Sequence, residues 1–221
     1  MTPQQTIETE SGKSQSFVEW VQANSRVVGI GAAVIVIGAI GAWFYIRSAE
    51  IKRQNADRGL NQAKQSLSAG NPALAESDLQ KVAARYKGTA AGAQAAMILA
   101  QLEFDQGKFA EGLKALDPYQ NVSAAGPNLG PVWALTGDGQ LSSGKPAEAA
   151  VSYQKAADAT PLFGEKAIYL SKSGRALMLA GKDAEARALW EKLVADPNAI
   201  AVRNEALVRL GELSAKPAGK S

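Results

Sequence analysis

Residues 174–190, GRALMLAGKDAEARALW, hold the pattern that decides the fold. The small residue Gly174 is followed seven positions later by Gly181, and Ala186 and Trp190 follow after five and four more. A glycine between two stretches rich in alanine and leucine is typical of a turn between helices. A small residue with a bulky one a helical turn further on suits two helices that pack closely. The stretch therefore predicts a helix hairpin.

The same pattern returns every 37 residues, which makes the chain a tandem repeat. A repeat of this length that contains two helices is typical of a solenoid, in which each copy buries its apolar face only against its neighbours. We therefore expect stacked helix pairs with one interlocking contact in each copy. From the first copy onward, the four positions are held by Ala63, Gly70, Ala75 and Leu79; by Ala100, Gly107, Gly112 and Leu116; by Gly137, Gly144, Ala149 and Tyr153; and by Gly174, Gly181, Ala186 and Trp190.

Glycine and proline mark where these helices end. Each turn glycine suits the left-handed backbone just past a helix end, and Pro161 and Pro197 stop two of the second helices. Residues 200–215 carry Gly211 in register and supply the first helix of a fifth copy, which we expect to act as a C-terminal cap. The expected first helices cover 50–69, 94–106, 132–143 and 165–180, and the expected second helices cover 73–86, 110–116, 147–159 and 184–195.

An apolar run precedes the repeats. Residues 27–46 carry no charge and are bounded by Arg26 and Arg47. As a helix they would span roughly 30 Å, the thickness of the hydrocarbon core of a bilayer. A cleaved signal peptide is the alternative, but its apolar core is shorter, about 7–15 residues. We therefore predict a transmembrane helix over 27–46. Three small residues on one of its faces are candidates for packing against another transmembrane helix: Gly31, Gly38 and Ala42.

The composition argues against chemistry. The chain has no histidine and no cysteine, which removes the commonest general base, thiol nucleophiles, disulfides and the usual zinc ligands. Its formal net charge is only +3 and its basic residues are interleaved with acidic ones, so no nucleic-acid partner is expected. We expect no catalytic residue, no cofactor and no metal. An enzyme that relies on carboxylates, lysines or hydroxyls stays open as an alternative.

The charges beside the apolar run bear on its orientation. Lys13 and Arg26 precede the run, whereas the residues that follow it include Arg47, Lys52, Arg53 and Arg58. Because positive residues favour the cytoplasmic side, this count by itself places the repeats in the cytoplasm. Contact with anionic lipid headgroups is an alternative role for the basic residues after the run.

The first helices of such a solenoid line its inner, concave surface. Counted from the small residue of each copy, the positions three before, one after and four after should point to that surface. Phe104, Leu141 and Met178 occupy the last of these positions, and ordinary packing between repeats is a second interpretation for them. The candidate partner-binding residues are Met97, Gln101, Phe104, Asp138, Leu141, Ser171, Arg175 and Met178.

The order of small residue, turn glycine and alanine resembles the tetratricopeptide repeat, although the period of 37 is longer than the usual period of about 34. Together with the apolar run, this resemblance predicts an all-α fold. We expect a single N-terminal transmembrane helix, then a tetratricopeptide-like solenoid of helical hairpins with about four repeats and a C-terminal capping helix.

The whole chain is also similar to the ancillary SecYEG translocon subunit family, the YfgM-like proteins. Its individual motifs are rich in alanine, so the order of the parts carries more weight than any one of them. The features that carry the resemblance are an aromatic stretch before the apolar run (Phe17, Trp20), the end of that run (Gly41, Trp43, Tyr45), the block 95–116, and the closing run 186–213 with Ala188, Leu189, Trp190 and Glu191.

This second resemblance implies a single-pass protein of the bacterial inner membrane. It implies a cytoplasmic tail over 1–26, a transmembrane helix over 27–46, a periplasmic repeat domain over 47–216 and a flexible tail over 217–221. The implied function is non-enzymatic: the protein binds Sec translocon subunits, a membrane-anchored periplasmic chaperone of the peptidyl-prolyl isomerase type, and secreted clients. A scaffold for envelope assembly and a membrane adaptor that faces the cytoplasm are the alternatives.

Overall fold

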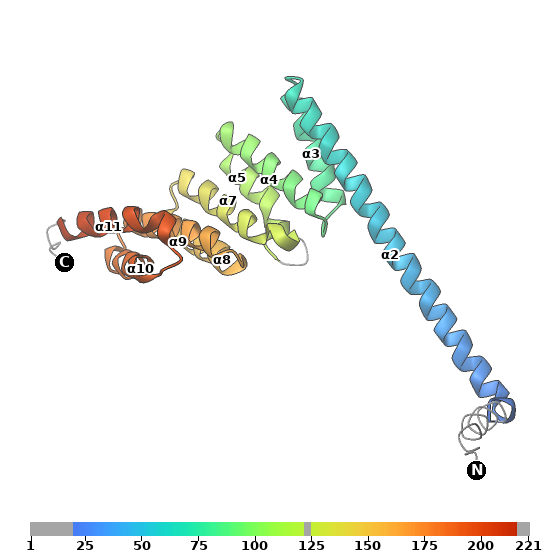
Figure 1. Cartoon of the computed structure of the whole chain (residues 1–221). Coiled ribbons are helices and arrows are strands. Elements are labelled where there is room, and N and C mark those ends of the chain that lie inside the picture. Colours follow the sequence, from blue (N-terminus) through green and yellow to red (C-terminus); the bar gives the residue numbers. More distant parts are fainter. Residues whose placement is uncertain (1–19, 122–124, 216–221) are drawn as a thin grey trace, which may run out of the picture. The chain divides into compact units, whose positions relative to one another are not determined.

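The computed structural model describes residues 20–121 and 125–215, which form helices joined by turns, with no strand in those two ranges. It divides into two compact units, Met1–Ile51 and Lys52–Ser221. The predicted tail over 217–221 and most of the predicted tail over 1–26 lie outside the described residues. The all-α fold expected from the sequence is confirmed (Figure 1).

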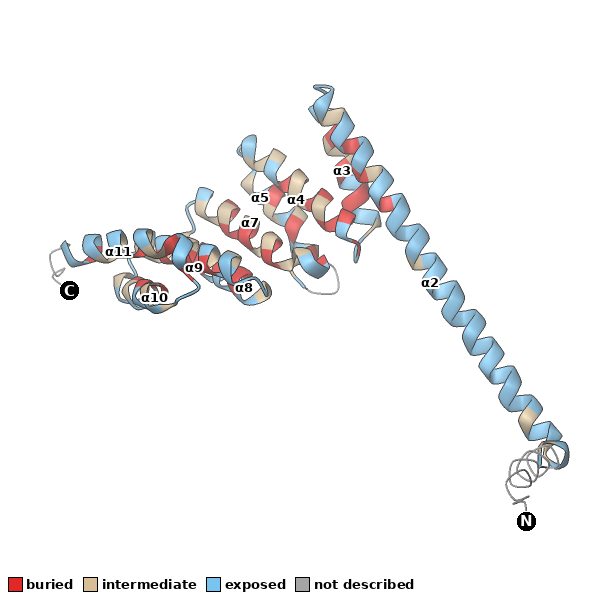
Figure 2. Ribbon diagram, viewed as in Figure 1, coloured by how far each residue is buried: buried red, intermediate tan, exposed pale blue. Residues whose placement is uncertain are grey.

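Helix α2 (Ser25–Ser68) contains the apolar run and continues into the first repeat without a break. It is long and apolar enough to cross a membrane by length and composition, and its most apolar stretch is not buried against any described part of the chain. That stretch is pale blue, for exposed, in Figure 2. A side chain at Gly31 or Gly38 would meet no described atom within 4 Å, so a packing partner for this face stays a prediction.

The second unit begins with the end of α2 and alternates between the first and second helices of successive repeats. From α3 onward each α-helix packs against the next one along the chain, α4 also packs against α7, and α9 also packs against α11. Two short 3-10 helices, η1 (Asp117–Tyr119) and η2 (Gly126–Asn128), lie between α5 and α7. The remaining first helices are α4 (Ala90–Asp105), α7 (Leu129–Ser142), α9 (Phe163–Leu179) and α11 (Ile200–Ala215), and the second helices are α3 (Pro72–Arg85), α5 (Phe109–Leu116), α8 (Pro146–Ala159) and α10 (Asp183–Ala195).

The turn glycines adopt the left-handed conformation that their positions predict. At the last of the four turns, the N–H of Gly181 donates to the carbonyl of Met178 at 3.2 Å, and the N–H of Lys182 donates to the carbonyl of Leu177 at 2.9 Å. This pair of bonds satisfies two of the carbonyls that a helix end leaves free. The same two bonds close the other three turns. The four glycines have positive φ angles: 74° at Gly70, 77° at Gly107, 77° at Gly144 and 72° at Gly181.

We expect Gly144→Ala to lower the free energy of unfolding by about 1 kcal/mol, because an alanine Cβ is disfavoured in the left-handed region. Gly164→Ala is the matched control, since Gly164 lies within α9 at a negative φ and no described atom would meet its Cβ within 4 Å. The control should be neutral or slightly stabilising, because alanine favours the helix. Urea titration of the full chain in detergent measures the free energy of unfolding of both variants. Equal losses of stability would contradict the view that the left-handed backbone at Gly144 requires glycine.

The core lies along the contact between the first and second helix of each repeat. A Cβ on Gly137 would lie 2.7 Å from the ring of Tyr153, and a Cβ on Gly174 would lie 2.6 Å from the ring of Trp190. In the two earlier repeats the small positions hold alanine and the bulky positions hold leucine, and all four side chains are buried. The expected close packing between the two helices of a repeat is therefore confirmed. Figure 2 marks the buried residues of these helices in red.

Three first helices begin earlier than the sequence predicted: α4 at residue 90 instead of 94, α7 at 129 instead of 132, and α9 at 163 instead of 165. For α4 the reason is Thr89, whose hydroxyl oxygen accepts a hydrogen bond from the N–H of Gly92 at 3.0 Å. The same hydroxyl donates to the carbonyl of Tyr86 at 2.7 Å. This cap starts the helix within the stretch of small residues that lay between the expected helices 73–86 and 94–106.

Candidate protein-binding surfaces

Of the three predicted binding positions in each repeat, the one directly after the small residue is the most exposed. Gln101 on α4 and Arg175 on α9 are exposed, and Asp138 on α7 is half-exposed. Gln101 donates a hydrogen bond to Asp105 one turn further along the same helix, at 2.8 Å. These side chains occupy the same place in three successive repeats, so the face they share is polar.

The other candidates on this face are largely covered. Met97, Phe104 and Met178 are partly buried against the cores of the repeats, and Leu141 packs against the core between α8 and α9. Ser171 is almost fully buried, with 3% of its surface exposed. The structure thus places these five side chains within or beside the packing between helices, and their role in binding stays a prediction.

Phe104 shows how this packing works. Its ring lies where a Cβ on Gly112 of α5 or on Gly139 of α7 would collide with it. The ring of Phe109 lies beside it, with 6.1 Å between the ring centroids. Phe104 therefore fills the space between one repeat and the next, and only glycine fits at the two positions that face it.

A polar junction joins α7, α8 and α9 on the surface of the first helices. The hydroxyl of Tyr153 donates to Oδ1 of Asp138 at 2.7 Å, and Nζ of Lys172 donates to Oδ1 and Oδ2 of the same carboxylate at 2.8 and 3.0 Å. Burial of the Tyr153 ring and its hydrogen bond to Asp138 raise the pKa of its hydroxyl. The sequence pattern pointed to Asp138 but not to its pairing with Tyr153 or Lys172.

A second junction of the same kind joins α9 and α11. The hydroxyl of Ser171 donates to Oε2 of Glu205 at 2.7 Å, and the guanidinium of Arg175 lies 3.5 Å from Oε1 of Glu205. Lys172 follows Asp138 by 34 residues, and Glu205 follows Ser171 by the same number. A spacing slightly shorter than the 37-residue period is the signal that could have revealed both junctions, because it brings facing positions of neighbouring first helices together.

These junctions set register and surface charge more than stability. The Lys172 and Asp138 side chains are 29% and 42% exposed, and those of Arg175 and Glu205 are 46% and 31% exposed. Ion pairs with this much exposure contribute at most about 1 kcal/mol each. They leave both signs of charge open to solvent along one face, which is the arrangement that orients a charged partner rather than binding it tightly.

Three grooves lie between successive second helices, and the sequence pattern did not predict them. Their volumes are about 390, 350 and 370 Å³. Each groove is floored by the first helix that lies between the two second helices, and the 37-residue period relates the three. Each groove is lined by one glutamate from the start of a second helix. These glutamates are Glu111, Glu148 and Glu185.

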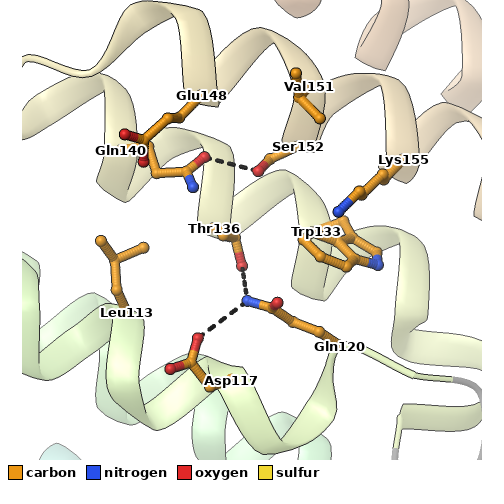
Figure 3. Close-up of a pocket in the computed structure, with 10 residues that line it drawn as sticks. All are labelled: Leu113, Asp117, Gln120, Trp133, Thr136, Gln140, Glu148, Val151, Ser152 and Lys155. Atoms are coloured by element: carbon orange, nitrogen blue, oxygen red, sulfur yellow. Dashed lines mark hydrogen bonds between the residues drawn. The ribbon is translucent and has the colours of Figure 1, made fainter.

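The polar groups of the groove between α5 and α8 bind one another (Figure 3). Nε2 of Gln120 donates to Asp117 at 3.3 Å and to the hydroxyl of Thr136 at 3.4 Å. The hydroxyl of Ser152 donates to Gln140 at 2.7 Å. With these amide and hydroxyl groups paired inside the protein, the charged side chains of Glu148 and Lys155 are the main polar groups that the groove presents to a ligand.

The same groove offers an aromatic and aliphatic lining instead. Figure 3 shows the ammonium of Lys155 beside the ring of Trp133, and the distance from Nζ to the ring centroid is 4.1 Å. Leu113 and Val151 lie on the other walls, and 56% of the surface of Val151 is exposed. The apolar part of this lining suits an apolar side chain of a ligand.

Tyr119 lines the second groove and is 1% exposed. Its hydroxyl donates to the carbonyl of Ala83 at 2.6 Å, and burial raises its pKa to about 12. The unfolded chain loses this proton near pH 10, whereas the folded chain keeps it until about pH 12. Because the folded state then binds more protons, stability should fall as the pH rises through this window.

Urea titrations of the full chain from neutral pH to about pH 12 test this expectation. Tyr119→Phe should be less stable at neutral pH, because it lacks the hydrogen bond to Ala83, and should lose less stability between about pH 10 and 12 than the unchanged chain. Parallel pH profiles for the two proteins would contradict it.

Both faces belong to the stacked helical hairpins of a repeat protein. No curated protein sequence matches the chain. A solved structure described as nearly identical TPR-like repeats of a kinesin light chain from Podosopora anserina has a TM-score of 0.52 and 17% identity, with 74% of this chain and 94% of that chain covered. At this identity the likeness shows the fold alone. Residues 56–172, more than half of the chain, match the tetratricopeptide repeat-like domain family, and the chain therefore belongs to that family.

Proposed function

We propose that this protein is a non-enzymatic interaction module of the bacterial inner membrane, an accessory subunit of the Sec translocon that brings periplasmic chaperones and secreted clients together. The observation that carries the proposal is helix α2, in which an exposed apolar stretch passes directly into the first repeat of a protein-binding fold. The resemblance of the whole chain to the ancillary SecYEG translocon subunit family supports the choice of partners.

The proposed mechanism is tethering. A module held in the membrane beside the channel meets its partners at a high effective concentration, so each contact can be weak. The polar row formed by Gln101, Asp138 and Arg175 fits that requirement, because exposed charges raise the association rate and orient a partner without slowing its release. A chaperone and a client could then occupy the row and the grooves at the same time.

Affinity purification of the tagged full chain in a mild detergent tests the proposal. Channel subunits and a membrane-anchored isomerase should co-purify with the unchanged chain and less with Arg175→Glu. Lys192→Glu is the matched control, because Lys192 is exposed on the second helix α10, away from the polar row. Recovery of envelope-assembly proteins without any channel subunit would favour the scaffold instead.

Orientation separates the proposal from the adaptor that faces the cytoplasm, which is favoured by the excess of positive charge after the apolar run. The chain has no cysteine, so Ala215→Cys introduces a unique thiol on α11. A membrane-impermeant thiol reagent should label it in intact spheroplasts, whereas Ser14→Cys should react only after lysis. The opposite pattern would place the repeats in the cytoplasm and refute the translocon role.

A further inference from the structure

Four basic residues gather at the end of the second unit that lies nearest in sequence to the apolar run. We call Lys52, Arg53, Arg85 and Lys87 the proximal basic patch, and all four residues are exposed. Nζ of Lys52 on α2 donates to the backbone carbonyl of Lys87 at 2.7 Å, which holds the residues just after α3 beside α2. The guanidinium of Arg85 lies 5.7 Å from the ring centroid of Tyr86.

Arg53 completes this patch through its place on α2. It precedes Ala56, Leu60 and Ala63 on one helical stripe, and those three side chains are buried against the first repeat. Arg53 is exposed, so the stripe leaves the core just before Ala56. Its side chain therefore lies on the side of α2 that faces α3.

Positive residues outnumber negative ones around the patch. Residues 79–102 contain no aspartate or glutamate, although they include Arg85 and Lys87. Within residues 20–121 and 125–215, none of the four patch residues forms an ion pair with a carboxylate. Asp78 lines the same groove as Arg85, but it pairs with Lys81 at 3.3 Å. The nearest acidic residues along α2, Glu50 and Asp57, are fewer than the four basic residues, so the patch keeps a net positive charge.

The chain also limits how far this patch can lie from the apolar run. Lys52 follows Ile46, the last residue of the predicted span, by six positions. In the helical conformation of α2 this is about 9 Å, and even a fully extended chain would reach no more than about 21 Å. The headgroup layer on one side of a bilayer is about 5–7 Å thick, and charges act over about 10 Å at moderate salt.

We propose that the proximal basic patch binds the anionic headgroups of phospholipids and holds the first repeat against the bilayer surface. The inference rests on the membrane anchoring in the proposed function, and adds a second contact to the single helix. It also gives the positive residues after the span a role that does not depend on which side of the membrane they occupy. The charge count and the periplasmic orientation are then no longer in conflict.

The test uses the full chain in nanodiscs made either of neutral phosphatidylcholine or of a mixture with anionic phosphatidylglycerol. A fluorophore on Ala84→Cys, an exposed position beside the patch, reports its distance from lipids that carry a nitroxide on the headgroup. Quenching should be roughly two-fold stronger in the anionic discs, and about 1 M salt should remove the difference. Equal quenching in both kinds of disc at every salt concentration would overturn the proposal.

Charge reversal identifies the residues responsible. Arg85→Glu combined with Lys87→Glu should abolish the effect of the anionic lipid. The matched control is Lys145→Glu combined with Lys182→Glu, two exposed lysines at the turns after first helices, the opposite ends of the hairpins. An equal loss in the control would overturn the assignment to this patch.

A flotation assay in alkaline carbonate separates this inference from the anchoring on which it rests. A chain that does not float with the lipid refutes the membrane anchor and the patch together. A chain that floats but shows no dependence on lipid charge refutes the patch alone. Flotation with quenching that depends on lipid charge and on Arg85 and Lys87 supports both.

Discussion

Trp190→Ala should lower the free energy of unfolding by about 3–5 kcal/mol, because removing a fully buried aromatic side chain loses its transfer free energy and leaves a cavity. Trp190 is fully buried, and its ring lies against Gly174 of the neighbouring first helix. The backbone of α9 cannot close the space without moving away from α8 and α11, which also pack against it. Urea titration of the full chain in detergent measures the loss.

Trp133→Ala is the control for the loss of an indole ring as such. Trp133 is partly exposed in the groove between α5 and α8, where Lys155 lies over its ring. Losing this contact and the partial burial should cost about 1 kcal/mol. Comparable losses for the two tryptophans would contradict the view that the contact between first and second helices carries the stability of each repeat.

The sequence predicted the parts of the fold that repeat. The positions of Gly174 and Trp190 could be recognised from the sequence alone, because both recur in every copy, although the sequence related Trp190 only to Ala186 one turn earlier on the same helix. The turn at Gly181 was equally predictable, since a left-handed helix end strongly favours glycine. The repeat period and the preference for glycine at a helix end are both visible as residue types at fixed positions in a single sequence.

The features that depend on neighbouring repeats were harder to predict. The sequence allowed two interpretations of Phe104, as a residue of the open face or as packing between repeats. The structure shows packing, because the ring fills the space opposite Gly112 and Gly139, and no local pattern connects those positions. The link between Asp138 and Lys172 depends on how closely α7 and α9 approach each other. The grooves arise from the spacing of whole helices, so they follow from packing rather than from any motif.

The four repeats solve the same packing problem in two ways. In the first two, the small position holds alanine and the bulky position holds leucine, whereas in the last two a glycine faces an aromatic ring. Where the first helix carries alanine, the second helix carries the smaller leucine, and where the first helix carries glycine, the second helix carries the larger aromatic residue. This exchange of volume across one contact predicts that the two kinds of pair can be interchanged only together.

We therefore expect Gly174→Ala and Trp190→Leu to rescue each other in part. Alone, Gly174→Ala places a Cβ 2.6 Å from the buried indole, and the strain should outweigh the gain in helix propensity. Alone, Trp190→Leu leaves a cavity and should cost a few kcal/mol. The double variant recreates the pair of the first two repeats, so it should be about 2 kcal/mol more stable than the sum of the single losses predicts.

Gly211 provides the control that makes this coupling specific. It holds the same register position in α11, but its Cβ would meet no described atom within 4 Å. Gly211→Ala should be neutral or stabilising, and its effect should simply add to that of Trp190→Leu. Because both glycines lie within helices and differ mainly in what faces them, coupling at Gly174 without coupling at Gly211 would show that the small position exists to receive the ring of the second helix. Additive losses at both positions would show instead that the glycines are retained for the helix backbone itself.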